Sequence, residues 1–174
     1  MPLGKFLGSY LQAAKFLNTT FNAIPNTYFV RKVKASDSYL VKCFIQKVLI
    51  QRGGVGIDKL YYDKDLADIH QAYNKENCHF WVLTKKGDIK GTLGMEMIGR
   101  KACLTKFYVD HDSMDHGLSL IKMAQSAAKR AKLEELSVVI DSNDSKITEM
   151  LRATSFSLST SGGEGLDVYV QTVI

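Results

Sequence analysis

The sequence predicts a single domain of the mixed α/β (α+β) class, with a mixed sheet and helices on both faces. Three observations lead to this prediction. The chain has 174 residues, of which 45% are hydrophobic and 24% charged, and this is typical of one domain with its own core. Stretches with helical periodicity alternate with stretches typical of strands. No run of 18 apolar residues occurs, so no membrane-spanning helix is expected.

The net charge of +5 originates at the beginning of the chain. Residues 1–34 contain five basic and no acidic side chains, and the remaining residues contain 18 of each. Nucleic-acid-binding domains usually cluster Lys and Arg along one face, so no nucleic-acid partner is expected. The cysteines Cys43, Cys78 and Cys103 are odd in number and form no C-x-x-C pair. Free thiols in a reducing, cytoplasmic location are therefore expected.

Residues 1–26 are expected to form an amphipathic helix that precedes a domain covering residues 27–174. Apolar side chains recur at helical spacing from Leu3 to Phe21. Docking of this helix on the domain, or on a second copy in a homodimer, is the favoured interpretation. Binding to another partner or to a membrane surface, and a cleaved targeting peptide, are the alternatives left open.

The first half of the domain is expected to contain one strand, two helices and a hairpin. In chain order these elements cover residues 28–35, 36–51, 63–74 and 79–98. Ser36 and Asp37 favour a helix start, and the glycines after Gln51 favour its end. In the second helix the apolar side chains of Leu66, Ile69 and Tyr73 lie on one side. The hairpin is predicted from two apolar strands around a turn that contains Gly87.

The second half is expected to alternate strands and helices. In chain order it comprises a strand at 102–109, an irregular segment at 110–117, a helix at 118–133, a strand at 136–140, a helix at 144–154 and a hairpin of strands at 156–161 and 166–174. The strand at 136–140 is continuously apolar, so we expect it to be buried on both faces. The helix at 118–133 is then expected to connect two parallel strands.

The loop at 110–117 combines side-chain types that bind metals. It contains Asp110, His111, Asp112, Asp115 and His116. All five lie in one short segment, and the twelfth residue counted from Asp110 is Ile121, where a calcium-binding loop needs Glu. No metal site is therefore expected.

Two phrases of the sequence, together with the order of elements, resemble a known family over residues 28–174. The phrase at 65–95, ending in "GDIKGTLGM", and the phrase at 107–144, beginning "FYVDHDSMDHGLSLI", resemble the GNAT superfamily of N-acetyltransferases. The first is similar to the family's second helix and central hairpin, and the second to its acetyl-CoA-binding strand, loop and helix. The resemblance implies a mixed, mostly antiparallel sheet. It also implies transfer of an acetyl or other acyl group from acyl-CoA, the co-substrate, to an amine of a small molecule or protein.

The donor motif of that family, V-x₄-[Q/R]-x₂-G-x-[G/A], corresponds to Val109, Met114, Gly117 and Ser119. Val109 and Gly117 match it, whereas Met114 and Ser119 depart from it. Such a loop holds the CoA pyrophosphate through backbone N–H groups at a helix start, and the preceding strand pairs with the pantetheine. The cofactor-binding residues that the resemblance implies are Phe107, Tyr108, Val109, Met114, Asp115, His116, Gly117, Leu118, Ser119 and Asn143.

The acid and base positions of the family are not matched. Leu151 stands where many members have a Tyr acid, and Thr105 and Cys103 stand where several have a Glu or His base. Glu96, on the preceding strand, is the first candidate for the base, followed by Cys103. The departures leave two alternatives to an N-acyltransferase. One is a catalytically impaired module that binds CoA or a protein partner, and the other is an association module acting through the N-terminal helix.

Overall fold

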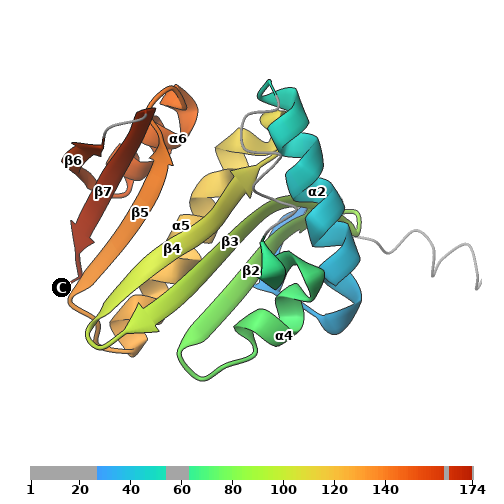
Figure 1. The fold of residues 1–174 in the computed structure, drawn as a ribbon, viewed down its shortest axis with the longest axis horizontal. Helices are drawn as coiled ribbons and strands as arrows, with labels where there is room; N and C mark the ends of the chain where they lie inside the picture. The colour runs from blue at the N-terminus through green and yellow to red at the C-terminus, as the bar shows by residue number, and fades with distance from the viewer. Residues whose placement is uncertain (1–26, 54–62, 163–164, 174) are drawn as a thin grey trace, which may run out of the picture.

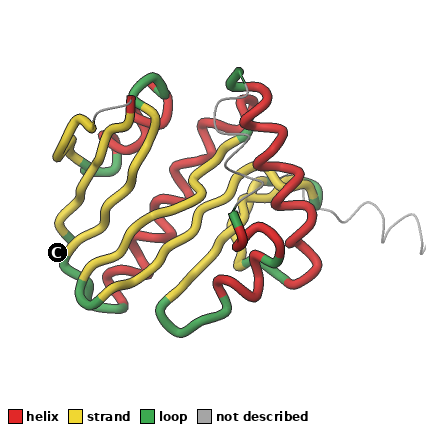
Figure 2. Tube along the Cα trace, in the orientation of Figure 1, coloured by secondary structure: helices red, strands yellow, loops and turns green. Residues whose placement is uncertain are grey.

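A computed structural model describes residues 27–53, 63–162 and 165–173. They contain one seven-stranded sheet with the order β1-β2-β3-β4-β5-β7-β6 (Figures 1 and 2). The strands are Tyr28–Lys32 (β1), Cys78–Lys85 (β2), Asp88–Ile98 (β3), Lys101–Val109 (β4), Glu135–Asp141 (β5), Ser157–Gly162 (β6) and Leu166–Thr172 (β7). Every neighbouring pair is antiparallel except β4 and β5, which are parallel. The predicted mixed, mostly antiparallel sheet is confirmed.

Helices cover both faces of the sheet, as predicted. The α-helices are Ser38–Gln51 (α2), Ile69–Tyr73 (α4), Met114–Arg130 (α5) and Ser145–Ala153 (α6), and 3₁₀ turns cover Ala35–Asp37 (η1), Lys64–Ala67 (η2) and His111–Ser113 (η3). One core cluster joins the sheet to α5 and α6, and a second joins the opposite face to α2 and α4. Among the described residues, no helix is both long enough and apolar enough to cross a membrane.

The parallel pair β4–β5 is the topological feature that positions the site. Residues Lys101–Leu104 pair with Glu135–Val138, and α5 connects the two strands. This confirms the predicted parallel arrangement with a helical connection. The two strands then diverge, so β1–β4 form one arm of the sheet and β5–β7 the other (Figure 1).

The prediction that β5 is buried on both faces is wrong. Leu136 and Val138 are buried against α5, but Val139, on the opposite face, is 51% exposed. The apolar run predicted the strand correctly, but it predicted the burial of the second face incorrectly. The reason is that α2 and α4 pack on the strands of the first arm, so that no helix of the described ranges covers this face of β5.

Two predicted helix starts also need correction. The fifth helix begins at Met114 rather than Leu118, because η3 precedes it without a break and the Ser113 N–H donates to the Asp110 carbonyl at 2.8 Å. Asp37 does not cap α2 with its side chain. Its carboxylate accepts the N–H of Lys34 at 2.7 Å instead and so fixes η1.

Some predictions concern residues outside the described ranges. The amphipathic helix expected at 1–26 is one of these, and so are Gly54 and Gly56. Gly53 is described. Its φ of +87° ends α2 in a conformation that glycine adopts without strain.

Candidate functional site

The candidate site lies where β4 and β5 separate. The last parallel pair is Leu104 with Val138, and from Thr105 to Val109 the strand has no β5 partner. Unpaired backbone at an interior position of a sheet needs a hydrogen-bonding partner from elsewhere. Within the part of the chain that the structure describes, the edge of β4 that faces β5 is therefore open to an extended ligand along these five residues.

A β-bulge in β4 marks the start of the open edge. Gly94 pairs with Thr105 and Thr92 with Tyr108, so β4 has one more residue than β3 across this interval. Lys106, inside the bulge, has a positive φ of 49°. Its carbonyl accepts the hydroxyl of the fully buried Thr92 at 2.8 Å. Because N–H and C=O of one trans peptide point in opposite directions, the Phe107 N–H points away from β3, toward the open edge.

A polar network of four side chains lies beside the bulge, on the face covered by α4. The Tyr73 hydroxyl donates to Glu96 Oε1 at 2.9 Å and lies 2.7 Å from Thr105 Oγ1. Lys106 Nζ lies 3.5 Å from the same hydroxyl. Burial is the main reason that the pKa of Tyr73 is raised to about 12. Tyr73 therefore stays protonated at neutral pH and continues to donate to Glu96.

Two carboxylates hold the Lys106 ammonium in place. Lys106 Nζ lies 2.9 Å from Asp65 and 3.2 Å from Asp63. Burial works against its charge, but Tyr73 and the two carboxylates outweigh burial and raise the pKa of Lys106. The lysine is consequently a fixed cation and not a base.

Tyr73 reaches this network only because position 94 is a glycine. A Cβ at Gly94 would lie 2.5 Å from Thr105 Oγ1 and 2.9 Å from the Tyr73 hydroxyl and ring. Phe80 packs against the same ring with centroids 5.0 Å apart. The ring is thus held between Phe80 and the bare backbone of β3.

The two predicted catalytic residues lie side by side. Glu96 and Cys103 are direct partners on β3 and β4, so both side chains face the network. Glu96 is half-buried, and among the described residues its second oxygen accepts no hydrogen bond. Burial, together with the Glu96 charge, raises the pKa of the Cys103 thiol. Cys103 is therefore a poor base, and Glu96 is the better candidate.

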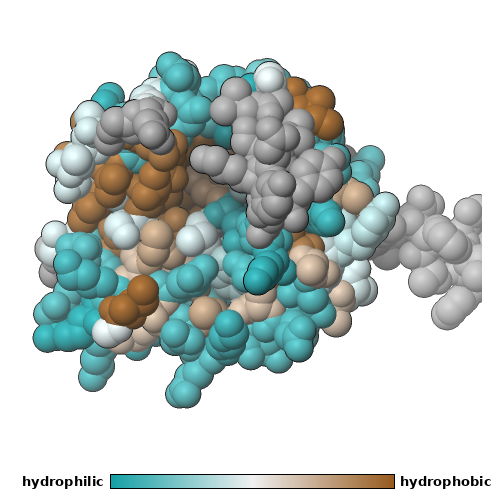
Figure 3. Space-filling model, viewed as in Figure 1, coloured by the Kyte–Doolittle hydropathy of each residue, from teal (hydrophilic) through white to brown (hydrophobic). Residues whose placement is uncertain are grey.

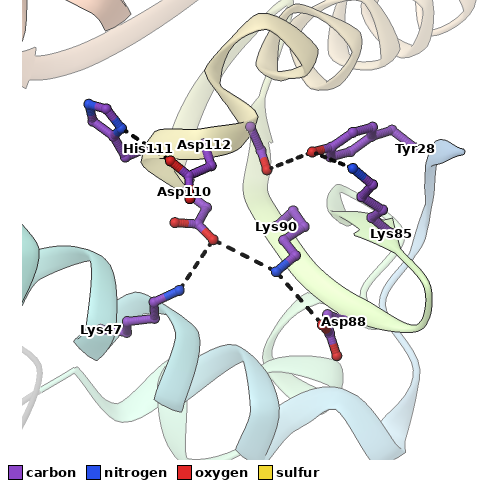
Figure 4. A network of polar contacts seen from close by, with 9 residues as sticks. Tyr28, Lys47, Lys85, Asp88, Lys90, Asp110, His111 and Asp112 are labelled. Carbon is purple, nitrogen blue, oxygen red and sulfur yellow. Dashed lines mark hydrogen bonds and ion pairs between the residues drawn. The ribbon is translucent and has the colours of Figure 1, made fainter. Parts of the chain in front are cut away.

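The N-terminus of α5 lies at the end of the open strand edge (Figure 4). The backbone N–H groups of the first helical turn, at Met114, Asp115 and His116, have no acceptor within a helix. Met114 is half-buried, while the Asp115 and His116 side chains are exposed. The His116 ring stacks on Tyr28 with centroids 3.6 Å apart. These residues can offer backbone donors and a positive dipole end to an anion.

Asp110, the first acid of the loop, is neutralised locally. It is 5% exposed, and its carboxylate lies 3.2 Å from Lys47 Nζ and 3.9 Å from Lys90 Nζ (Figure 4). Its charge is therefore compensated by α2 and β3. The two other acids, Asp112 and Asp115, are exposed and screened by solvent.

The remaining predicted residues of the motif are structural or peripheral in their contacts. Gly117 lies within α5, where a Cβ would be 2.9 Å from Met150 Sδ and 3.0 Å from Val109 Cγ2. Val109 is buried, and Phe107, Tyr108 and Leu118 are half-buried. The Ser119 hydroxyl donates to the His116 carbonyl at 2.6 Å. Asn143 is exposed after β5, and its N–H donates to Asp141 at 2.9 Å.

The ion pairs Arg100–Glu134 and Lys101–Glu135 join the two arms of the sheet at the paired ends of β4 and β5, and a further ion pair joins them at the other end. Arg52, directly after α2, lies 2.6 Å from Asp144, the N-cap of α6. Asp144 also accepts the Ile147 N–H at 3.2 Å. The pair connects the two sides of the wide end of the separation between β4 and β5 (Figure 1).

Sequence reasoning did not identify Tyr73, Lys106 or Thr92 as site residues. Tyr73 was expected only to pack on one side of its helix, and its hydroxyl contacts depend on Gly94, which lies 21 residues further on. No local pattern marks Lys106, because the bulge follows from strand register. The "GT" of the central hairpin, Gly91-Thr92, was noted only for its resemblance to the family.

Comparison with known proteins identifies the fold. No protein-family sequence model matches the chain, and no curated protein sequence does. Solved structures do match. A GNAT-family acetyltransferase of Staphylococcus aureus has a TM-score of 0.75 at 16% identity, covering 85% of this chain and 100% of that one.

Two further matches have more specific descriptions. PaiA N-acetyltransferase of Thermoplasma acidophilum, solved in complex with coenzyme A, has a TM-score of 0.73 at 15% identity, covering 84% of this chain and 99% of that one. The ribosomal-protein-S18-alanine N-acetyltransferase of Escherichia coli has a TM-score of 0.64 at 10% identity, covering 84% and 94%. At these identities the likeness concerns the fold, and the chain has the fold of the GNAT acetyltransferases.

Proposed function

We propose that the protein is an N-acyltransferase that moves an acetyl or other acyl group from acyl-CoA to an amine. The observation that carries the proposal is the bulge at Lys106, with the Phe107 N–H directed toward an unpaired strand edge beside a polar network. A thioester carbonyl at this N–H would be polarised as negative charge develops on its oxygen. The network beside it would receive the amine.

Donor binding would use backbone more than side chains. The unpaired edge at Phe107–Val109 would hydrogen-bond the pantetheine, and the first turn of α5, from Met114 to His116, would hold the pyrophosphate. The departures of Met114 and Ser119 from the donor motif do not remove any N–H. Local neutralisation of Asp110 by two lysines lowers the repulsion that this loop would otherwise exert on phosphate.

Glu96 would act as the base toward the amine. An ammonium must lose a proton before its nitrogen can attack, and the free oxygen of Glu96 would accept it. Tyr73 would fix the other oxygen through its 2.9 Å hydrogen bond. The amine nitrogen then bonds to the carbonyl carbon, the carbon–sulfur bond breaks, and the proton that the new amide loses reaches the CoA sulfur.

The leaving sulfur does not require an acid at position 151. A thiol has an ordinary pKa of about 8.5, so a thiolate is an acceptable leaving group near neutral pH. Leu151 is fully buried and packs in the core with α5, so it takes no part in proton transfer. The proton that the new amide loses can reach the thiolate through solvent after the thiolate leaves.

The experiment measures initial rates of CoA release from acetyl-CoA with ethylamine as acceptor. Glu96→Gln keeps an oxygen that accepts from Tyr73 but removes the base, so kcat/KM is expected to fall about 10²-fold or more. The deficit should shrink as the pH rises toward the amine pKa of about 10, because free amine then needs no base. Glu149→Gln, an exposed change on α6, is the matched control and should leave the rate unchanged.

Three results would overturn parts of the proposal. If CoA raises the melting temperature but the wild-type protein acetylates no amine, the chain is a CoA-binding module without catalysis. This is the first of the two alternatives to an N-acyltransferase that the sequence leaves open. If neither CoA nor acetyl-CoA changes the melting temperature, the donor site is wrong as well. A pH-independent effect of Glu96→Gln would assign Glu96 a positioning role in place of base catalysis.

A further inference from the structure

Among the described residues, none covers an apolar face that the second arm of the sheet presents next to the polar network. Val139 is 51% exposed and Leu166 39% exposed, and Val168 and Val170 are half-buried. Register places all four on one face, since Val139 pairs with Val168, Ser137 with Val170 and Asp141 with Leu166. We refer to these four side chains as the apolar wall. Figure 3 shows apolar side chains gathered over β5 and β7, beside a hollow in the surface.

The apolar wall and the polar network form one continuous surface. Glu96, Cys103, Ser137 and Val170 are successive partners across β3, β4, β5 and β7, so their side chains form a row on one face. Thr105 and Val139 are the next outward-facing residues of β4 and β5 after that row, at the point where the strands diverge. A ligand that contacts Glu96 can therefore extend directly over the wall.

The polar end of this surface favours a cation. It contains the carboxylates of Asp63, Asp65 and Glu96. Its cation Lys106 is already bound by both aspartates, and Arg52, which lies near Tyr108, is paired with Asp144. Glu96 retains one oxygen without a partner in the described part of the chain. A further positive group is thus attracted electrostatically, whereas an acidic one is repelled.

We propose that the acceptor is a primary amine with an apolar body, such as an alkyl or arylalkyl amine, whose ammonium lies at Glu96 and whose body lies on the apolar wall. This inference rests on the proposed function and specifies its acceptor class. A second charge on the acceptor would have to lie against the wall, where burial of an unpaired charge is unfavourable. Polyamines and amino acids are therefore disfavoured.

The test is a chain-length series with the full chain, acetyl-CoA and the primary amines from ethylamine to hexylamine. Each methylene that leaves water on the wall is expected to lower KM by up to about fourfold, with little change in kcat. Cadaverine, a diamine of similar length to hexylamine, should lose this gain because its second ammonium meets the wall.

Two matched variants locate the effect. Val139→Asp places a charge in the wall and is expected to raise KM for hexylamine about tenfold or more, while KM for ethylamine and acetyl-CoA stays unchanged. Leu158→Asp is the control. Leu158 is 45% exposed on the same arm, but it pairs with Tyr169 and so lies on the opposite face, and its replacement should leave the chain-length series as it is.

The outcomes separate this inference from the proposed function. Acetylation of ethylamine and hexylamine with equal KM would overturn the inference and leave the acyltransferase intact. Absence of any transfer would overturn the proposed function, and this inference with it. If Val139→Asp converts a dimer to a monomer in light scattering and does not alter the KM ratio, the wall is an interface between two copies of the chain and not an acceptor site.

Discussion

At the residue scale, Thr92 and Gly94 position the backbone and side chains of the candidate site. Both lie on β3, the strand next to the bulge. Thr92 holds the Lys106 carbonyl, and Gly94 leaves space for the Tyr73 ring. Neither residue lies at the open strand edge itself. Thr92 and Gly94 therefore affect the chemistry only by positioning Lys106 and Tyr73.

Thr92→Val is expected to lower kcat without changing the fold. It removes the hydroxyl that fixes the Lys106–Phe107 peptide, so the N–H that polarises the carbonyl loses its orientation. Complete removal of such a donor costs about 2.7–4 kcal/mol of transition-state stabilisation, and this is the upper limit for the effect of Thr92→Val. Thr84→Val is the matched control, because Thr84 is also a buried strand threonine that donates to a backbone carbonyl, that of Phe29 at 3.4 Å. An equal loss of kcat in both variants, measured as CoA release, would mean that the hydroxyl of Thr92 has no special role.

Gly94→Ala is expected to displace Tyr73 and to destabilise the protein by about 1–3 kcal/mol. The added methyl would lie 2.5 Å from Thr105 and 2.9 Å from Tyr73, so the ring must move. Tyr73→Phe removes the hydroxyl and keeps the packing of the ring. It therefore separates the loss of the hydroxyl contacts from the loss of stability. Urea unfolding measures the loss of stability. A Gly94→Ala protein as stable as wild type would show that the ring is not confined.

At the element scale, Leu151 and Asp37 show how the helices are anchored. Leu151, on α6, is 0% exposed and belongs to the core between α5 and the sheet. Asp37, at the start of α2, is bound by Arg31 at 2.6 and 3.0 Å and by the Lys34 N–H at 2.7 Å. Leu151 anchors α6 by packing, and Asp37 anchors the start of α2 by charge. Leu151 should therefore be sensitive to side-chain volume and Asp37 to pH.

Leu151→Tyr is expected to destabilise the protein by about 1–3 kcal/mol, because a larger side chain overfills a buried position. It should not raise turnover, since the side chain points into the core. Leu151→Met, which keeps the volume, is expected to cost less than about 1.5 kcal/mol. A stable Leu151→Tyr variant with faster acetyl transfer would place this residue near the leaving sulfur and refute the assignment to the core.

Asp37→Asn is expected to lower stability at neutral pH and to have little effect in acid. Burial raises the pKa of Asp37, but the hydrogen bonds from Arg31 and Lys34 outweigh burial and lower it overall. A lowered folded-state pKa contributes stability above the ordinary value of about 3.9 and loses it as the pH falls through the folded-state value. Urea unfolding at pH 7 should give a difference of about 1.5–3 kcal/mol from wild type, and at pH 3 a smaller one. A constant difference would contradict this assignment.

At the scale of the whole molecule, the sequence predicted the sheet, the helices on both faces and the parallel β4–β5 pair. Periodicity, a local property, predicts the individual helices and strands. Their order along the chain predicts a mixed sheet with helices on its faces, and the resemblance to the GNAT superfamily implied that the sheet is mostly antiparallel. The exposed face of β5 was predicted wrongly, because the apolar run around Val139 does not state what covers it. The start of α5 at Met114 was missed because η3 and α5 are continuous, so that no cap separates them.

The candidate site was predictable only in part, for a physical reason. Glu96 could be singled out because strand alternation gives the face on which it lies, and Cys103 because it stands at a base position of the family that the sequence resembles. Tyr73, Lys106 and Thr92 come together through the register of three elements and one bulge. Such a register depends on tertiary packing, so no single segment of the sequence contains it.

The measurement that tests the central claim most directly is detection of the acylated product. The wild-type protein is incubated with acetyl-CoA and hexylamine, and mass spectrometry quantifies N-acetylhexylamine while a thiol reagent quantifies free CoA. If the open edge of β4 is the site of acyl transfer, amide and CoA form in equal amounts, and the Glu96→Gln protein forms about 10²-fold less of both at neutral pH. CoA release without any amide from hexylamine or ethylamine, or no release at all in a protein that binds CoA, would contradict it.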